Sequence, residues 1–166
     1  LKGMADVKIT YSGKEALEIT NPADPPDVVL LDRHMPNLSG DEVLAELHGM
    51  EIHPRIVMVT AIDPGLGILD LPFDEYLCKP VEREDVRAAV THQCEVLAYE
   101  LLGEYFQLES KRAVIEAELP SDQLDESDAF RTVDEQIDTL ETRLRRLLPD
   151  FEEQLESFSD IGREGY

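Results

Sequence analysis

The run Val28-Val29-Leu30-Leu31-Asp32-Arg33-His34-Met35-Pro36 carries the strongest structural signal in this chain of 166 residues. Four apolar residues lead directly into one aspartate, and an unbroken apolar run of this kind predicts a strand buried on both faces. The aspartate then stands at the C-terminal end of the strand, where open α/β sheets bind ligands. Aspartate is also common in turns, so Asp32 taken alone fits a turn residue as well as a reactive group.

Two further short apolar runs also end next to a polar residue. Residues 56–59 precede Thr60, and residues 75–78 precede Lys79. A helical pattern over residues 42–48 separates the first run from the second. Strands that alternate with helices through short loops predict a doubly wound α/β fold with a parallel sheet and right-handed crossovers.

The polar residues at these strand ends form a chemically useful set. In a parallel sheet the C-terminal ends of neighbouring strands lie side by side, so Asp32, Thr60 and Lys79 are expected to converge. A carboxylate can act as the nucleophile toward a phosphoryl group, and a lysine and a hydroxyl can hold the phosphoryl oxygens. Each residue alone fits an ordinary strand end, but the three in this order and spacing favour phosphoryl transfer to Asp32.

The N-terminal segment predicts one more strand and one helix. Val7, Ile9 and Tyr11 alternate with polar residues, as in a half-exposed strand at a sheet edge. Ser12 is suited to cap the helix that follows. Farther along, the breakers in residues 63–67 exclude a long helix, so we expect only a short or irregular helix around residues 66–70.

Together these features resemble the receiver domain of two-component response regulators. The matching residues are Ser12-Gly13-Lys14-Glu15-Ala16-Leu17, Val28 to Asp32 with Met35-Pro36 and Gly40, Val59-Thr60-Ala61, and Tyr76-Leu77-Cys78-Lys79-Pro80. The resemblance covers residues 1–95 and implies a flavodoxin-like sheet with strand order 2-1-3-4-5. It also implies that a sensor histidine kinase phosphorylates Asp32 and that Thr60 and Lys79 bind the phosphoryl oxygens. Tyr76 matches the family's aromatic switch, and the Lys79-Pro80 peptide matches its cis or strained bond.

The resemblance further implies a magnesium site, which this sequence supplies only in part. In the family, the residue matching Asp32 and the backbone carbonyl of the residue matching His34 bind Mg²⁺. An acidic pair at the end of the family's first strand completes that site, and neither the strand nor the pair is found in this sequence. Because Mg²⁺ prefers nearly octahedral oxygen ligation, we expect its binding here to be weak or absent. We therefore expect an N-terminally truncated receiver domain that lacks the first strand and the first helix.

The C-terminal third predicts a helical hairpin. Apolar residues at helical spacing run from residue 84 to about Leu119, Pro120 to Asp128 form a polar loop, and a second helix begins near residues 129–132. The second helix has 4-3 apolar spacing, as a coiled-coil seam does, and Pro149 should kink or divide it. Residues 96–166 resemble the HalX output domain of halophilic archaea, in Tyr105-Phe106-Gln107-Leu108, Lys111-Arg112-Ala113 and Glu116-Ala117-Glu118-Leu119. The two apolar stripes can pack on each other or form a homodimer.

Composition narrows the range of partners. The 37 acidic and 15 basic residues give a net charge of −22, which disfavours direct binding to nucleic acid and suits a protein adapted to high salt. No apolar stretch is long enough for a membrane span, and no signal peptide is visible. Cys78 and Cys94 lack paired spacing, so we expect buried, reduced thiols in a cytoplasmic protein.

The sequence leaves three hypotheses for function. The first is a response regulator, not an enzyme, in which phosphorylation of Asp32 changes a helical output region. The second is a pseudo-receiver that is never phosphorylated and acts as a protein-interaction or dimerisation scaffold. The third, a phosphohydrolase with an aspartate nucleophile, is disfavoured because such enzymes usually place a second carboxylate two residues after the first, where this chain has His34.

Overall fold

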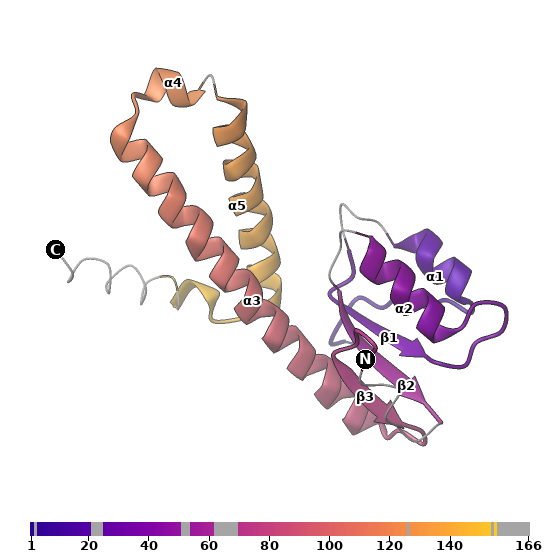
Figure 1. Ribbon diagram of the computed structural model, residues 1–166. Coiled ribbons are helices and arrows are strands. Elements are labelled where there is room, and N and C mark those ends of the chain that lie inside the picture. The colour runs from indigo at the N-terminus through magenta and orange to yellow at the C-terminus, as the bar shows by residue number, and fades with distance from the viewer. Residues whose placement is uncertain are drawn as a thin grey trace. The chain divides into compact units, whose positions relative to one another are not determined.

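The computed structural model describes residues 1, 3–20, 25–50, 54–61, 70–125, 127–153 and 155 (Figure 1). It divides into two compact units, Leu1–Cys94 and Glu95–Tyr166, which are considered separately below. The elements in chain order are α1 (Gly13–Ile19), β1 (Val28–Asp32), α2 (Gly40–Gly49), β2 (Arg55–Thr60), β3 (Glu75–Cys78), α3 (Arg83–Glu118), α4 (Ser121–Asp125) and α5 (Asp128–Leu147). The short helix expected around residues 66–70 falls almost wholly outside the described residues.

The first unit is built on a parallel sheet with strand order β1-β2-β3. Asp32 pairs with Val59, and Thr60 pairs with Cys78, so the C-terminal ends of all three strands lie at one edge. Helices α1 and α2 lie on the same side of this sheet (Figure 1). The core between them and the sheet consists of Leu31, Val43, Leu44, Leu47, Ile56 and Met58. The predicted α/β class and parallel pairing are therefore confirmed.

The predicted edge strand at residues 7–11 is wrong. These residues form no strand, and Val7, Ile9 and Tyr11 are 45%, 70% and 84% exposed. A strand needs a hydrogen-bonded neighbour, and among the described residues no strand lies beside residues 7–11 to pair with them. For the same reason β1 is an edge strand, and Leu30 is exposed although the apolar run predicted burial on both faces.

A buried amide fastens the start of α3 to the opposite edge of the sheet. Gln93 is only 2% exposed. Its Oε1 accepts a hydrogen bond from Arg55 Nε at 3.0 Å, and its Nε2 donates to Glu75 Oε2 at 2.8 Å. Arg55 also forms an ion pair with Asp74 at 3.0 Å. Because Arg55 and Glu75 begin β2 and β3, one side chain connects the N-terminal ends of two strands to the helix.

The second unit is a helical hairpin whose two long helices, α3 and α5, share an apolar core. The core residues are Leu97, Ala98, Leu101, Leu102, Tyr105, Ile137, Leu140, Leu144, Leu148 and Phe151. Tyr105 contacts Phe151 edge-on, with ring centroids 5.8 Å apart. The predicted hairpin and the packing of its stripes on each other are confirmed. Helix α5 ends at Leu147, and helical backbone resumes at 151–153, so Pro149 lies at a division as predicted.

Three details of the prediction need correction, two in residues 95–166 and one at Cys78. The segment expected as a polar loop contains α4, whose first turn begins directly after Pro120, a residue that suits a helix start. Ile115 and Leu119 continue the apolar stripe of α3 but are 41% and 42% exposed. Cys78 is exposed rather than buried, because it lies at the end of an edge strand.

Candidate functional site at the end of the sheet

Asp32, the last residue of β1, lies at the centre of a small polar cluster. Its Oδ2 accepts a hydrogen bond from Lys79 Nζ at 2.5 Å, and its Oδ1 accepts one from the backbone N–H of His34 at 3.1 Å. The side chains of Asp32 and Lys79 are 36% and 40% exposed, so a solute can reach both. Partial burial raises the pKa of Asp32, but the hydrogen bonds and charges of Lys79 and His34 outweigh it and hold this pKa below its ordinary value.

The ends of β2 and β3 bring Thr60 and Lys79 to the same place. Thr60 is the last residue of β2 and is completely buried. Its backbone carbonyl accepts a hydrogen bond from the N–H of Lys79 at 2.7 Å, which fixes the lysine backbone beside β2. The Lys79-Pro80 peptide is cis, as the receiver resemblance implies. The three strand-end residues singled out in the sequence therefore converge at one edge.

Helix α2 begins unusually close to Asp32. The N–H of Gly40 donates to the carbonyl of Arg33 at 2.9 Å. A Cβ on Gly40 would lie 2.4 Å from the carbonyl oxygen of Asp32 and 2.7 Å from Cα of Arg33, so only glycine fits. Ser39 and Glu42 form a capping box that starts the helix. The capped helix thereby holds the loop after Asp32.

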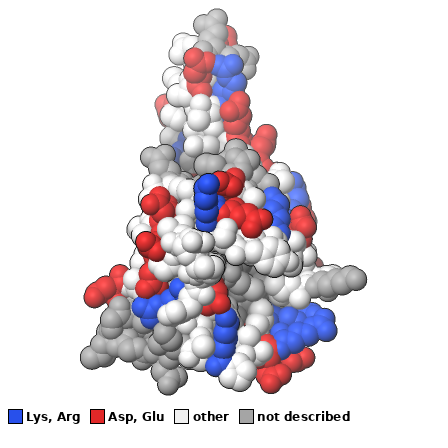
Figure 2. Space-filling view, turned by 90° about the vertical axis from the view of Figure 1, so that its right-hand side faces the viewer, with Lys and Arg blue, Asp and Glu red and all other residues white. Residues whose placement is uncertain are grey.

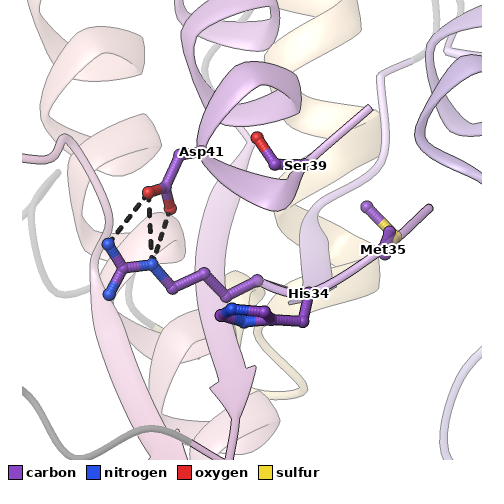
Figure 3. A pocket seen from close by; sticks show the side chains of 5 residues that line it. His34, Met35, Ser39 and Asp41 are labelled. Carbon is purple, nitrogen blue, oxygen red and sulfur yellow. Dashed lines mark hydrogen bonds and ion pairs between the residues drawn. The ribbon is translucent and has the colours of Figure 1, made fainter. Parts of the chain in front are cut away.

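Arg33 connects this loop to α2 through its side chain. Its Nε lies 3.1 Å from both carboxylate oxygens of Asp41, and its NH2 lies 2.9 Å from Oδ2 (Figure 3). The bond to Asp41 is the largest influence on the pKa of Arg33 and raises it above its ordinary value. Arg33 and Asp41 thus form a small network between the loop after Asp32 and α2.

An open hollow of about 310 Å³ lies beside this network. Figure 3 shows its lining, which consists of Arg33, His34, Met35, Ser39 and Asp41. Tyr76 is half-buried; its ring joins the periphery of the apolar core and packs against Phe73, with centroids 5.6 Å apart.

No local sequence pattern singles out Arg33 or Asp41. An acidic residue in the first turn of a helix is common whether or not it has a partner, because it interacts favourably with the helix dipole. The Arg33–Asp41 pair joins a loop to a helix, so it follows no periodic pattern.

The described residues do not supply a complete magnesium site. Asp32 offers a carboxylate and His34 a backbone carbonyl, but no group of three or more potential Asp, Glu, His or Cys ligands occurs in the described part of the chain. Asp32 also already accepts a hydrogen bond from Lys79. This donor set falls short of the six oxygens that Mg²⁺ prefers, so these residues alone do not fit the ion.

Two family models match the chain in adjacent stretches. Residues 1–91 match the response regulator receiver domain, and residues 95–161 match the HalX domain. No helix among the described residues has the length and apolarity needed to cross a membrane.

Similar proteins agree with these matches. A Haloferax volcanii protein whose name assigns it to transcriptional regulation is 41% identical over 112 residues, which make up 67% of this chain and 19% of that protein. The alkaline phosphatase synthesis transcriptional regulatory protein PhoP of Bacillus subtilis is 36% identical over 51% of this chain and 36% of its own length. The chain therefore spans only about a fifth to a third of these relatives.

A solved structure supports the fold. The signal receiver domain of a Vibrio parahaemolyticus protein aligns with a TM-score of 0.52 and 20% identity, over 57% of this chain and 75% of that one. The parallel sheet of the first unit agrees with this likeness. Because the receiver model matches more than half of the residues, the chain belongs to the response regulator receiver domain family, and a HalX domain follows the receiver.

Proposed function

We propose that this chain is a phosphorylation-controlled response regulator in which Asp32 accepts a phosphoryl group from a sensor histidine kinase. The observation that supports the proposal best is the position of Lys79 Nζ, 2.5 Å from the Asp32 carboxylate and next to the end of β2, where Thr60 lies. An exposed carboxylate, a cation and a hydroxyl-bearing residue at one sheet edge are the groups that phosphoryl transfer to aspartate requires.

The chemistry follows from this arrangement. One oxygen of Asp32 attacks the phosphorus of a phosphohistidine, the P–N bond breaks as the O–P bond forms, and the imidazole leaves and takes up a proton. Because its pKa is lowered from the ordinary value of an aspartate, the Asp32 carboxylate is ionised and ready to attack near neutral pH. The lysine ammonium then neutralises part of the charge of about −1.5 to −2 that a phosphoryl group carries.

The proposed output involves Thr60, Tyr76 and α3. Thr60 reorganises around the phosphoryl oxygens, Tyr76 follows, and the surface formed by β3 and the start of α3 changes. We propose residues 1–95 as the receiver and residues 96–166 as the HalX-like output region. A population shift of this kind requires differential stabilisation of only a few kcal/mol.

Intact mass spectrometry tests the phosphoacceptor. The full-length gene product is incubated with a small-molecule phosphodonor, with and without Mg²⁺, and one added phosphoryl group is expected. Asp32→Asn should abolish the mass gain, whereas Asp128→Asn, at an exposed site in the hairpin, should leave it unchanged. If Asp32→Asn is labelled as well as the parent protein, the assignment of Asp32 is wrong.

A pseudo-receiver that serves as an interaction or dimerisation scaffold is the second candidate. It is favoured by one observation, the incomplete oxygen set around Asp32 for Mg²⁺. The codons upstream of Leu1 separate the two candidates. An acidic pair encoded there supports the phosphorylated switch, and its absence supports the scaffold.

We propose that the partners are proteins rather than DNA. The net charge is −22, and on the face in Figure 2 basic side chains stand among acidic ones instead of forming one basic patch. The name of the Haloferax volcanii relative points to transcriptional regulation, a role that this chain would serve through a partner protein in the cytoplasm. A homodimer through the hairpin remains part of this proposal.

A further inference from the structure

We propose that the open end of the helical hairpin, formed by Ile115 and Leu119 of α3 and Phe130 of α5, is a docking surface for a basic amphipathic helix of a partner protein. The proposal goes beyond the phosphoacceptor site, because it assigns a binding surface to residues that take no part in phosphoryl transfer. It does not depend on the phosphorylation of Asp32.

The apolar stripe of α3 continues past the hairpin core. Leu108 packs against that core, and no described residue from 109 to 132 belongs to it. Arg112 still reaches toward α5, where its Nη1 lies 3.6 Å from Oδ1 of Asp134. Ile115 and Leu119 follow Arg112 at intervals of three and seven residues, so they lie on the same face of the helix. They are nevertheless 41% and 42% exposed.

The two long helices separate at this end of the hairpin. Figure 1 shows α3 and α5 diverging toward α4, which carries the chain from one to the other. On α5, the stripe that contains Val133 and Ile137 extends back to Phe130, which is partly buried and lies outside the core. Both stripes therefore extend beyond the region in which the helices pack on each other.

The spacing of these residues suits a helix as the partner element. Apolar side chains at intervals of three, four and seven residues form the ridges and grooves into which another helix packs. The segment from Leu108 to Leu119 is about 16 Å long, or about three helical turns. A short amphipathic helix in the partner is enough to cover it.

The charges around the open end indicate the chemistry of the partner. Residues 109–134 contain eight acidic and three basic residues. Glu118 and Asp122 are exposed, whereas Arg112 and Arg131 already form ion pairs with carboxylates of the hairpin. A second copy of the chain would bring the same excess of negative charge, which opposes self-association at this end. A helix with lysine or arginine beside its apolar face complements both the stripe and the charge.

Fluorescence anisotropy of a labelled model peptide tests the surface with the full chain. The probe has about 18 residues, about 27 Å as a helix, with leucine on one face and lysine on the other. Ile115→Ser should weaken its binding about tenfold or more, because the apolar burial of one side chain is lost. Val114→Ser is the matched control. Val114 is the neighbouring residue and is 62% exposed, but it lies off the stripe, so the affinity should stay within about twofold.

A second pair of variants tests the charge. Glu118→Gln combined with Asp122→Asn should weaken binding about three- to tenfold at about 0.15 M salt and less than about twofold at about 1 M salt, where the Debye length is about 3 Å. Glu95→Gln combined with Asp138→Asn removes the same charge elsewhere in the second unit. This control should stay within about twofold at both salt concentrations.

Circular dichroism checks that each variant folds, which is expected because the changed side chains are exposed. If Ile115→Ser does not fold, Leu119→Ser repeats the test on the same stripe. Hydrogen exchange then locates the peptide, whose binding should slow exchange in residues 111–119 and 128–133 and leave β1 and β2 unchanged.

Three results would overturn the docking surface. The first is no binding of the peptide, or an equal loss of affinity in Ile115→Ser and Val114→Ser. The second is equal binding of a peptide that carries glutamate in place of lysine. The third is a dimer of the chain alone that Ile115→Ser converts to a monomer in sedimentation, because a second copy would then occupy the surface. None of these measurements uses a phosphodonor, so failure to label Asp32 would overturn the proposed function alone.

Discussion

Replacing Gly40 with alanine should destabilise the first unit selectively. The new Cβ would lie 2.4 Å from the carbonyl oxygen of Asp32 and 2.7 Å from Cα of Arg33. Both are backbone atoms, so no side chain can turn aside, and about 1 Å of movement between β1 and α2 is needed to restore ordinary contact. Overpacking of this kind costs about 1–3 kcal/mol, and alanine recovers up to about 1 kcal/mol through its helix propensity. We expect a net loss of about 2 kcal/mol.

Hydrogen exchange followed by mass spectrometry is the assay of choice, because it reports on each unit separately. In Gly40→Ala, the opening free energy of peptides from β1 and α2 should fall by about 2 kcal/mol, while hairpin peptides from α5 keep their protection. The chain supplies two matched controls. A Cβ on Gly49 or on Gly103 would meet nothing within 4 Å. Gly49→Ala should therefore be neutral or slightly stabilising, and Gly103→Ala should stabilise the hairpin by about 0.5–1 kcal/mol.

Equal protection of β1 and α2 in Gly40→Ala and in the parent protein would refute the reasoning. So would an equal loss in Gly49→Ala, because the effect would then come from changing any glycine of α2 rather than from the close approach at Asp32.

Three other predictions concern single side chains. Asp32 should titrate below the ordinary range of an aspartate in an NMR titration, and its midpoint should rise in Lys79→Met. Since the folded-state pKa of Asp32 is lowered, its contribution to stability is present above the unfolded-state pKa and is lost as the pH falls through the folded-state value. A midpoint that Lys79→Met leaves unchanged would contradict this. Leu144→Ala, at a side chain that is 0% exposed, should cost about 2–5 kcal/mol in thermal unfolding of the hairpin, against less than about 0.5 kcal/mol for Val114→Ala at 62% exposure. Ser39→Ala, which removes the cap of α2, should cost about 0.5–2 kcal/mol, and unchanged exchange in α2 would argue against the capping box.

The sequence predicts the elements whose signals are local. The apolar runs that end at Asp32, Thr60 and Cys78 become β1, β2 and β3, because burial between layers of a sheet protein selects continuous apolar residues. The capping box at Ser39 marks the start of α2. This signal is also local, because its hydrogen bonds join residues only three positions apart. The contact of Asp32 with Lys79 also follows, because parallel pairing brings strand ends together.

The errors occur where structure depends on a distant partner. Alternation at Val7, Ile9 and Tyr11 describes a strand only if another strand lies beside it, and the described sheet ends at β1. The same edge position exposes Leu30, which a two-sided sheet would bury. At the site, the Arg33–Asp41 pair depends on how the loop and the helix pack together. Single-sequence patterns carry no information about that packing.

The buried amide of Gln93 restricts which residue can occupy its position. Its oxygen faces a donor, Arg55, and its nitrogen faces an acceptor, Glu75, so the site requires one group of each kind. Glutamate has no donor for Glu75 and would add a second negative charge, and leucine would remove both hydrogen bonds. Asparagine is shorter by one methylene and cannot span the same distance. Among side chains of this size only glutamine meets the polarity on both sides, and a slip of α3 by one turn would break both bonds together.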